Sequence, residues 1–269
     1  MVNDDSNYKT TITVADSAPT LYYYCSNHSG MGGQINTNTT HGSTNFDGSL
    51  LSVVQSNETS GFSISKYTGT GSLATVGHGL GSTAQWVIIK KRSASGNWVI
   101  GHHQNGFDGQ LYFDSGAFSS NSGSFNNTAP TSTVVTINTD STINTSSATY
   151  VMYCFTEIEG YSKFGSYTGN GSTDGTFVFT GFRPAWILIK QTNSNGSWVI
   201  HDNKRSSFNV IDEDLFANLS SAESDNGVDK DFLSNGFKHR ASHSAVNGSG
   251  STYIYMAFAE QPFKFSNSR

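Results

Sequence analysis

The stretch YTGTGSLATVGHGLGSTAQWVIIKKRSASGNWVI at 67–100 is repeated as YTGNGSTDGTFVFTGFRPAWILIKQTNSNGSWVI at 167–200. The two stretches match without a gap at a constant offset of 100 (167 − 67 = 100). The shared positions include Tyr67/Tyr167, Gly69/Gly169, Gly71/Gly171, Gly81/Gly181, Trp86/Trp186, Lys90/Lys190, Gly96/Gly196 and Trp98/Trp198. The closing segments match too, because NTSSATYVMYCFTEIEG from Asn144 is echoed by NGSGSTYIYMAFAEQPF from Asn247. Two copies of one unit therefore make up most of the chain.

The composition favours β-strands joined by polar turns. Of the 269 residues, 13% are charged and 13% are aromatic, and 28 are glycine. Such an aromatic content argues against disorder, which goes with few aromatic residues and high charge. The rest is rich in Ser, Thr and Asn, which compete with the helical backbone and favour turns. A core large enough for two modest domains fits this length.

Short apolar runs bounded by turn residues predict the strands. Runs at 85–91 and 97–102 are separated by a short Gly-containing turn, which predicts a β-hairpin. Runs at 132–138 and 150–158 close the unit, and no segment keeps a helical period for three turns. The sequence thus predicts an all-β protein with two tandem, homologous β-sandwich (jelly-roll-like) units at 61–160 and 161–269. We call them repeat 1 and repeat 2, and a short β-rich segment at 1–60 precedes them.

The duplicated residues have structural interpretations. Trp86/Trp186 and Trp98/Trp198 are predicted to be core or inter-sheet anchors, since both copies must keep what determines the fold; a stacking platform for sugar rings is the alternative. The paired glycines of the YTGxG turn and Gly81/Gly181 are expected at positive φ. Lys90 and Lys190 are expected at solvated strand ends, and Glu157 and Glu260 at strand exits. Cys154 is expected to be a small buried apolar residue.

One motif has the composition of a metal site. YYYCSNHSGMGG spaces Cys25, His28 and Met31 as C-x2-H-x2-M, and it resembles the C-terminal copper loop of cupredoxins. A blue-copper site needs a second His besides the Cys and His, and none of the 24 residues before Cys25 is His. His41 lies downstream, at a spacing that the motif does not demand. We keep the three residues as candidate copper ligands but expect no cofactor, and interpret 1–60 as a cupredoxin-like remnant that serves as an adaptor.

No enzyme signature is present. The chain contains neither a GxSxG elbow nor an HExxH helix nor a phosphate-binding GxxxxGK[ST] loop. The His201–Asp202 pair is expected at the surface of a strand end, and the acidic run 211–215 matches no known calcium loop. Catalytic residues are therefore not predicted, and the protein is expected to be non-enzymatic.

Charge and hydropathy limit the partners. A net charge of −5 supplies no basic stripe for nucleic acid. The longest apolar runs have the length of strands, too short to span a bilayer, and the polar N-terminus does not resemble a signal peptide. We expect neither nucleic acid nor a membrane as partner.

Long stretches carry a family likeness. They are GFSISKYTGTG…TVGHGLG, YVMYCFTEIEGYSKFGSYTGNGSTDGTFVFTGFRPAW and FLSNGFK…NGSGSTYIYMAFAEQPFKF. These resemble a repeat of virion structural proteins, tail-fibre proteins among them, of marine tailed bacteriophages. The resemblance covers roughly 21–265 and implies a virion protein made in the host bacterial cytoplasm and released by lysis. It implies no binding residues.

The expected function is a non-enzymatic virion structural protein, tail-fibre or tail-associated, in contact with other virion proteins. A homo-oligomer is expected, with a trimer preferred, and a glycan of the host surface is a further expected partner. The alternatives are a capsid decoration or head-fibre protein and a carbohydrate-binding module. The last would need exposed, clustered aromatic residues in the variable middle of a repeat: Tyr112, Phe113 and Phe118, or Phe208 and Phe216.

Overall fold

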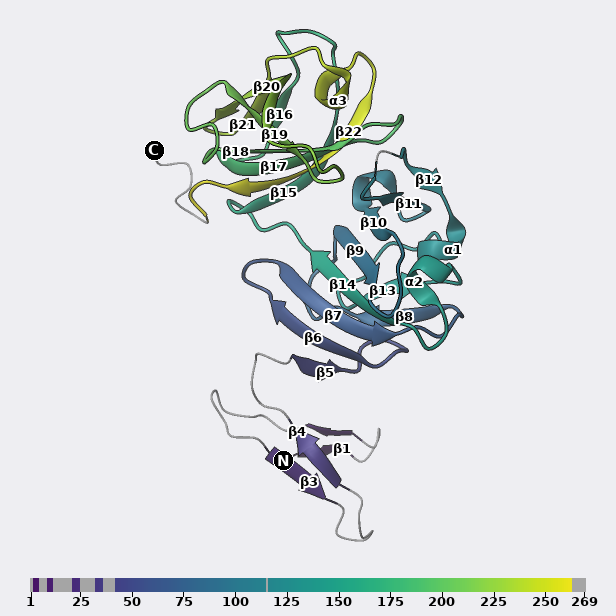
Figure 1. Cartoon of the computed structure of the whole chain (residues 1–269). Helices are drawn as coiled ribbons and strands as arrows, with labels where there is room; N and C mark the ends of the chain where they lie inside the picture. The colour runs from purple at the N-terminus through teal and green to yellow at the C-terminus, as the bar shows by residue number, and fades with distance from the viewer. Residues whose placement is uncertain are drawn as a thin grey trace.

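The computed structural model describes residues 2–4, 9–11, 21–24, 32–35, 42–114 and 116–262 (Figure 1). In this part of the chain nearly every element is a β-strand. The helical elements are short: η2 (His103–Asn105), α1 (Ser122–Phe125), α2 (Ser141–Asn144) and α3 (Ser244–Asn247). The predicted all-β class with little helix is confirmed. Among the described residues, no helix has the length and apolarity needed to cross a membrane.

The chain begins with small antiparallel pairs. Their strands are β1 (Val2–Asp4) with β2 (Lys9–Thr11), and β3 (Leu21–Tyr24) with β4 (Gly32–Ile35). β6 (Ser52–Asn57) then pairs with β5 (Ser43–Asn45) on one side and with β7 (Phe62–Thr68) on the other. Two strands that precede residue 61 therefore extend the sheet of repeat 1.

Repeat 1 is a sandwich of a large and a small sheet. The large sheet has the order β12-β11-β10-β9-β14-β7-β6-β5, and the small sheet pairs β13 with β8. The remaining strands are β8 (Ala74–Gly77), β9 (Trp86–Lys91), β10 (Trp98–His102), β11 (Gly109–Tyr112), β12 (Ser119–Ser120), β13 (Val134–Ile137) and β14 (Thr149–Phe155). β9 and β10 form the predicted hairpin, with Trp98 opposite Lys90.

Repeat 2 has the same order of strands but a single sheet, and its described residues contain no counterpart of η2 and α1. Its order is β15-β22-β17-β18-β19-β20-β21-β16, so the long β20 joins β19 to β21 and links what are two sheets in repeat 1. The strands are β15 (Ser162–Thr168), β16 (Phe177–Phe179), β17 (Pro184–Gln191), β18 (Trp198–Asp202), β19 (Ile211–Phe216), β20 (Ser224–Leu233), β21 (Gly236–His239) and β22 (Thr252–Ala259).

Each repeat buries its own core. Strand residues that alternate toward the interior supply it, as expected from the two-residue period of a strand. Repeat 1 contributes Val87, Ile89, Val99, Met152 and Cys154 among others, and repeat 2 contributes Ile187, Ile189, Val199, Phe232 and Tyr253 among others. The expected burial of Cys154 is confirmed, since its side chain is fully buried and burial raises its pKa well above that of an exposed thiol.

Glycine is required at two duplicated turn positions. Gly71 and Gly171 have φ angles of 75° and 67°, and Gly81 and Gly181 have φ angles of 65° and 86°. Only glycine adopts such angles without steric cost. The expectation of positive φ is confirmed at these positions but is wrong for Gly69 and Gly169, the first glycines of the YTGxG turns. There a Cβ would meet backbone atoms of the Asn144 and Asn247 turns, so close packing is what favours glycine.

Both repeats share a buried asparagine that holds the first turn. Asn144 ends α2, donates to the carbonyls of Ser72 and Asn138 at 2.7 Å, and accepts from the Thr70 N–H at 2.8 Å. Asn247 ends α3 and makes the equivalent bonds to Ser172, Ala241 and Asn170. Both side chains are fully buried. The matched bonds give a physical reason why both copies keep this asparagine.

Replacing Asn247 with alanine is expected to cost about 3 kcal/mol of folding stability, because it leaves several buried backbone groups without partners. Chemical denaturation followed by circular dichroism measures the loss. Asn144→Ala is the matched variant in repeat 1 and is expected to cost a similar amount. A loss below about 1 kcal/mol in both variants would contradict the structural role of this asparagine.

A third buried cluster joins the two repeats. It contains Trp86, Ile100 and Leu111 from repeat 1 and Phe164, Leu188, Trp198, Ile254 and Met256 from repeat 2. The rings of Trp86 and Trp198 lie 6.1 Å apart, and Trp198 Nε1 donates to the Tyr112 carbonyl at 2.8 Å. We call this cluster the inter-repeat layer. It packs the outer face of one sheet against the outer face of the other, so the two repeats form one body (Figure 1).

Repeat 1 also bonds to the edge of the repeat 2 sheet. β15 ends that sheet, and the backbone of Phe164 points away from its neighbour β22. The Phe164 N–H donates to Glu157 Oε1 at 2.8 Å, and the Phe164 carbonyl accepts from His103 Nε2 at 2.7 Å. Side chains of repeat 1 thus satisfy edge groups of repeat 2.

Candidate functional site

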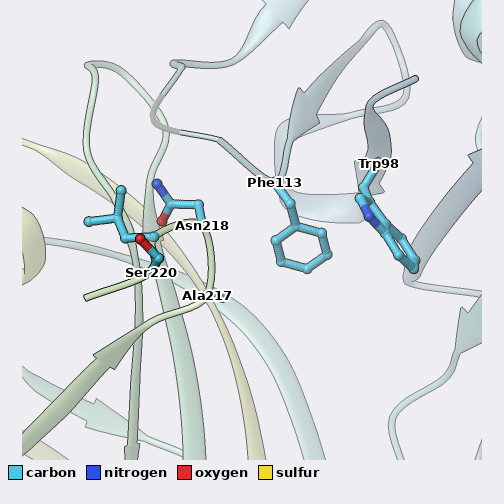
Figure 2. A pocket seen from close by; sticks show the side chains of 6 residues that line it. Trp98, Phe113, Ala217, Asn218 and Ser220 are labelled. Carbon is cyan, nitrogen blue, oxygen red and sulfur yellow. The ribbon is translucent and has the colours of Figure 1, made fainter. Parts of the chain in front are cut away.

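A groove lies at the junction of the two repeats (Figure 2). It is open to solvent, has a volume of about 550 Å³ and is lined by Trp98, Phe113 and the segment Ala217, Asn218, Leu219 and Ser220. Trp98 begins β10 and Phe113 follows β11, whereas the segment follows β19 of repeat 2. Figure 2 shows Phe113 between Trp98 on one side and the segment on the other. We call this site the junction groove.

The Trp98 side of the groove is held by its neighbours. Tyr153 lies 6.2 Å from the Trp98 ring with a 26° angle between the planes, and Phe113 meets it edge-on at 6.4 Å. The Lys90 ammonium lies 5.6 Å over the same ring and donates to the Gly96 carbonyl. Despite these contacts Trp98 is 39% exposed. The arrangement leaves an aromatic surface open at a fixed place.

The opposite side is polar and tied to repeat 2. Asn218 Oδ1 accepts from the backbone N–H of Trp198 at 2.8 Å, and the Ala217 N–H donates to the Trp198 carbonyl at 2.9 Å. The Leu219 N–H donates to the Phe216 carbonyl at 3.2 Å. Asn218 Nδ2 also donates to Ser197 Oγ at 3.4 Å, so these bonds fix the backbone of the segment at the groove, where Ser220 is exposed.

The duplicated tryptophans are used differently in the two repeats. Trp86 and Trp198 are fully buried, so their predicted role as core anchors is confirmed. Trp186 is only half-buried. For Trp98 the prediction of a core residue is wrong, because the inter-repeat layer covers its equivalent Trp198 and leaves Trp98 at the rim.

The aromatic residues named from the sequence are only partly brought together. Phe113 lines the junction groove, and Phe118 lines a smaller pocket of about 290 Å³ with Asn105, Thr192 and Asn193. Phe208 is 85% exposed, whereas Phe216 packs against the core of repeat 2. The sequence analysis did not predict that Trp98 lies beside Phe113. The predicted hairpin, which places Trp98 at the start of a strand, was the one feature of the sequence that could have indicated it.

The candidate copper ligands Cys25, His28 and Met31, together with His41, lie outside the described residues. Within the ranges that the structure does describe, no group of three or more His, Cys, Asp or Glu side chains is arranged to hold a metal ion. The candidate copper site therefore stays a prediction from sequence.

Repeat 2 buries a group of ionisable side chains that the sequence did not predict. Lys230 is fully buried, and its Nζ lies 2.8 Å from His201 Nδ1 and donates to the Val228 carbonyl at 2.9 Å. His239 faces Lys230 across the β20–β21 pair, and Asp214 is buried nearby. Burial lowers the pKa of Lys230, His201 and His239 well below their usual values, and the Lys230 charge lowers both histidine values further. The expected surface position of His201 is therefore wrong.

The duplicated lysines also differ from expectation. Lys190 is fully buried, donates to the Gly196 carbonyl, and has a pKa that burial lowers to about 8. Lys90 makes the equivalent bond to Gly96 from a half-buried position. Both lysines thus close the hairpin turn of their repeat, and the prediction of a solvated strand end is wrong for Lys190.

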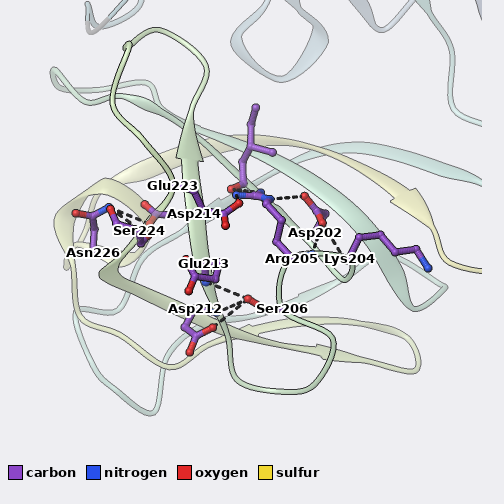
Figure 3. A network of polar contacts seen from close by, with 11 residues as sticks. Asp202, Lys204, Arg205, Ser206, Asp212, Glu213, Asp214, Glu223, Ser224 and Asn226 are labelled. Carbon is purple, nitrogen blue, oxygen red and sulfur yellow. Dashed lines mark hydrogen bonds and ion pairs between the residues drawn. The ribbon is translucent and has the colours of Figure 1, made fainter.

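The acidic run at 211–215 lies in β19 and has protein partners (Figure 3). Asp212 accepts from the Ser206 hydroxyl at 3.0 Å, and Asp214 accepts from Asn226 Nδ2 at 2.9 Å. Beside the run, Arg205 forms a 2.7 Å ion pair with Asp202. These bonds connect β18, β19 and β20 and give the carboxylates a structural role.

Fold and groove together define a class: an all-β protein of two sandwich-like repeats, fused by an aromatic layer and hollowed at their junction. The chain belongs to the family described as domain of unknown function (DUF7483), whose model matches residues 35–262. That match includes both repeats, so the family domain is the pair and not the single unit. No curated protein matches the chain, and no solved structure does.

Proposed function

We propose that this protein is a non-enzymatic structural protein of a bacteriophage virion, tail-fibre or tail-associated, that contacts the host surface through its repeats. The observation that carries the proposal furthest is the inter-repeat layer, in which Trp86, Trp198 and Phe164 are buried between the two sheets. The resemblance of both repeats to virion proteins of tailed phages adds to it.

The layer supports this proposal because a fibre has to hold its successive units in fixed positions along its length. Each large aromatic side chain buried between the repeats contributes on the order of 2 kcal/mol or more to their association. Hydrogen bonds of His103 and Glu157 with the backbone of Phe164 help to fix the orientation of one repeat on the other. Two units coupled in this way hold their outer loops at a fixed distance from each other, and β5 and β6 extend the sheet of repeat 1 on the side away from repeat 2 (Figure 1).

Within this proposal the N-terminal segment 1–60 attaches to other virion proteins and the repeats face outward. The protein is made in the host bacterial cytoplasm and incorporated into the particle there. Closed homo-oligomers are the commonest state of such assemblies, and we propose a trimer. Light scattering after size-exclusion chromatography measures the oligomer.

Locating the protein in intact particles tests the proposal. An antibody against the purified chain, followed by gold labelling and a virion reconstruction, is expected to place it at the tail or its fibres. Density spread over the capsid lattice would overturn the tail assignment in favour of a decoration protein. Absence from purified particles would overturn the virion role altogether.

A further inference from the structure

We infer that the junction groove binds an uncharged glycan, with one pyranose ring seated between the aromatic side formed by Trp98 and Phe113 and the polar side that carries Asn218 and Ser220. The inference rests on the proposed contact with the host surface and names the ligand class for it.

The two sides of the groove match the two kinds of surface on a pyranose ring. A sugar ring has faces of C–H groups, which pack against aromatic rings, and a rim of hydroxyls, which need hydrogen-bond partners. Trp98 offers a partly exposed aromatic surface, and the Phe113 ring stands edge-on to it and also lines the groove. Across from them, the Asn218 amide already accepts from the backbone N–H of Trp198 and donates to Ser197 Oγ, which leaves one N–H donor. The exposed Ser220 hydroxyl both donates and accepts.

The size of the groove fits a small ligand better than a folded partner. Its volume of about 550 Å³ lies in the range of small-molecule sites. A stable protein interface buries on the order of 800 Å² on each partner, far more than six side chains offer. Its lining residues Trp98, Leu219 and Ser220 are exposed, so a ring within a longer chain can enter without a free chain end.

The charges around the groove favour an uncharged ligand. None of the six lining residues has an ionisable side chain. Lys90, which lies over the Trp98 ring, already donates to the Gly96 carbonyl. Asp114, which follows Phe113 and is exposed, has the opposite sign. An anionic sugar would therefore find no charged partner among the six lining residues.

The groove exists only because both repeats contribute to it. The Phe113 ring lies 4.7 Å from the buried Trp198 ring, and Trp198 also fixes Ala217 and Asn218 through its backbone. Packing of the repeats thus sets the distance between the two sides. The same contact gives a reason for the exposure of Trp98, whose equivalent in repeat 2 is the buried centre of that packing.

Affinity electrophoresis of the full chain tests the inference. At a net charge of −5 the protein migrates toward the anode in a native gel, and a soluble polysaccharide that it binds slows it. The probes are dextran, yeast mannan and galactomannan as neutral chains and alginate as an anionic one. We expect retardation by at least one neutral chain, unchanged between low and 0.3 M salt because screening does not act on uncharged ligands.

Three variants locate the binding. Trp98→Ala is expected to weaken binding by about tenfold or more, since it removes the stacking surface. Ser220→Trp fills the groove from an exposed position and leaves the aromatic packing intact, so it keeps the inference testable if Trp98→Ala unfolds. Phe208→Ala, which removes an aromatic side chain that is 85% exposed and outside the groove, is the matched control and is expected to bind like the parent protein.

The outcomes separate the ligand class from the virion role. Failure of all neutral chains to retard the protein, retardation by alginate alone, or full binding by Ser220→Trp would each overturn the glycan site. A protein found at the phage tail that fails these tests keeps its proposed function and loses the inference. A protein that binds a neutral chain through Trp98 but is absent from particles keeps the site and loses the virion role.

Discussion

Replacing Trp198 with alanine is expected to lower the free energy of unfolding by about 4 kcal/mol. Trp198 is fully buried in the inter-repeat layer, where its ring contacts those of Trp86 and Phe113. The substitution leaves a cavity between the repeats and removes the donor to the Tyr112 carbonyl. Guanidinium denaturation followed by circular dichroism and tryptophan fluorescence measures the loss. We also expect the two repeats to unfold in separate steps once this contact is weakened.

The duplication supplies the matched control. Trp98 occupies the equivalent position in repeat 1, 39% exposed at the rim of the junction groove. Trp98→Ala is expected to cost about 1 kcal/mol, because it removes edge contacts and leaves no closed cavity. Equal losses in the two variants would show that the inter-repeat layer does not hold the repeats together as described.

Acid is expected to destabilise the protein, beginning as the pH falls below about 6.5. Burial lowers the pKa of His78, His102, His201 and His239, and the Lys230 charge acts on the last two in the same direction. Below the ordinary histidine pKa the unfolded chain takes up protons that the folded chain does not. Each such histidine lowers the unfolding free energy by about 1.4 kcal/mol per pH unit until its folded-state pKa is reached.

Denaturant unfolding at intervals between pH 7.5 and pH 5 measures this slope. His239→Ile places in β21 the residue that ends the equivalent strand β13, Ile137. It removes one of the four histidines and is expected to reduce the slope. Asp214 and Asp229 act in the opposite direction, because burial raises the pKa of both carboxyls. A slope unchanged by His239→Ile would contradict the burial of an uncharged imidazole at this position.

The fold class and the duplication could be read from the sequence. The two-residue alternation of the strands and the glycines at positive φ act locally, within a few residues of each other. That is why the hairpin of β9 and β10 was predicted with its correct partners, and why helix was predicted to be minor. Cys154 was correctly expected to be buried because an apolar strand surrounds it.

The candidate site was harder to predict, because it depends on contacts between the repeats. A repeated sequence indicates that equivalent residues have equivalent roles, and this holds for Asn144 and Asn247. It fails for Trp98 and Trp198, since the outer faces of two sheets meet with different residues at the centre of contact. The buried Lys230 was missed for a related reason. Charge predicts exposure in a sequence, and only the pairing of β20 with β21 brings His239 next to this lysine.

The bonds at the edge of β15 have a consequence for synthesis on the ribosome. The chain emerges from its N-terminus, and domains generally fold in that order. β5 and β6 are made before β7 and extend the sheet beyond it, and His103 and Glu157 are made before or with the edge of β15 that they bond. The residues that bond the outer edges of β7 and β15 are therefore already synthesised when these strands emerge. Neither edge has to stay unpaired, and available to another chain, until later residues are made.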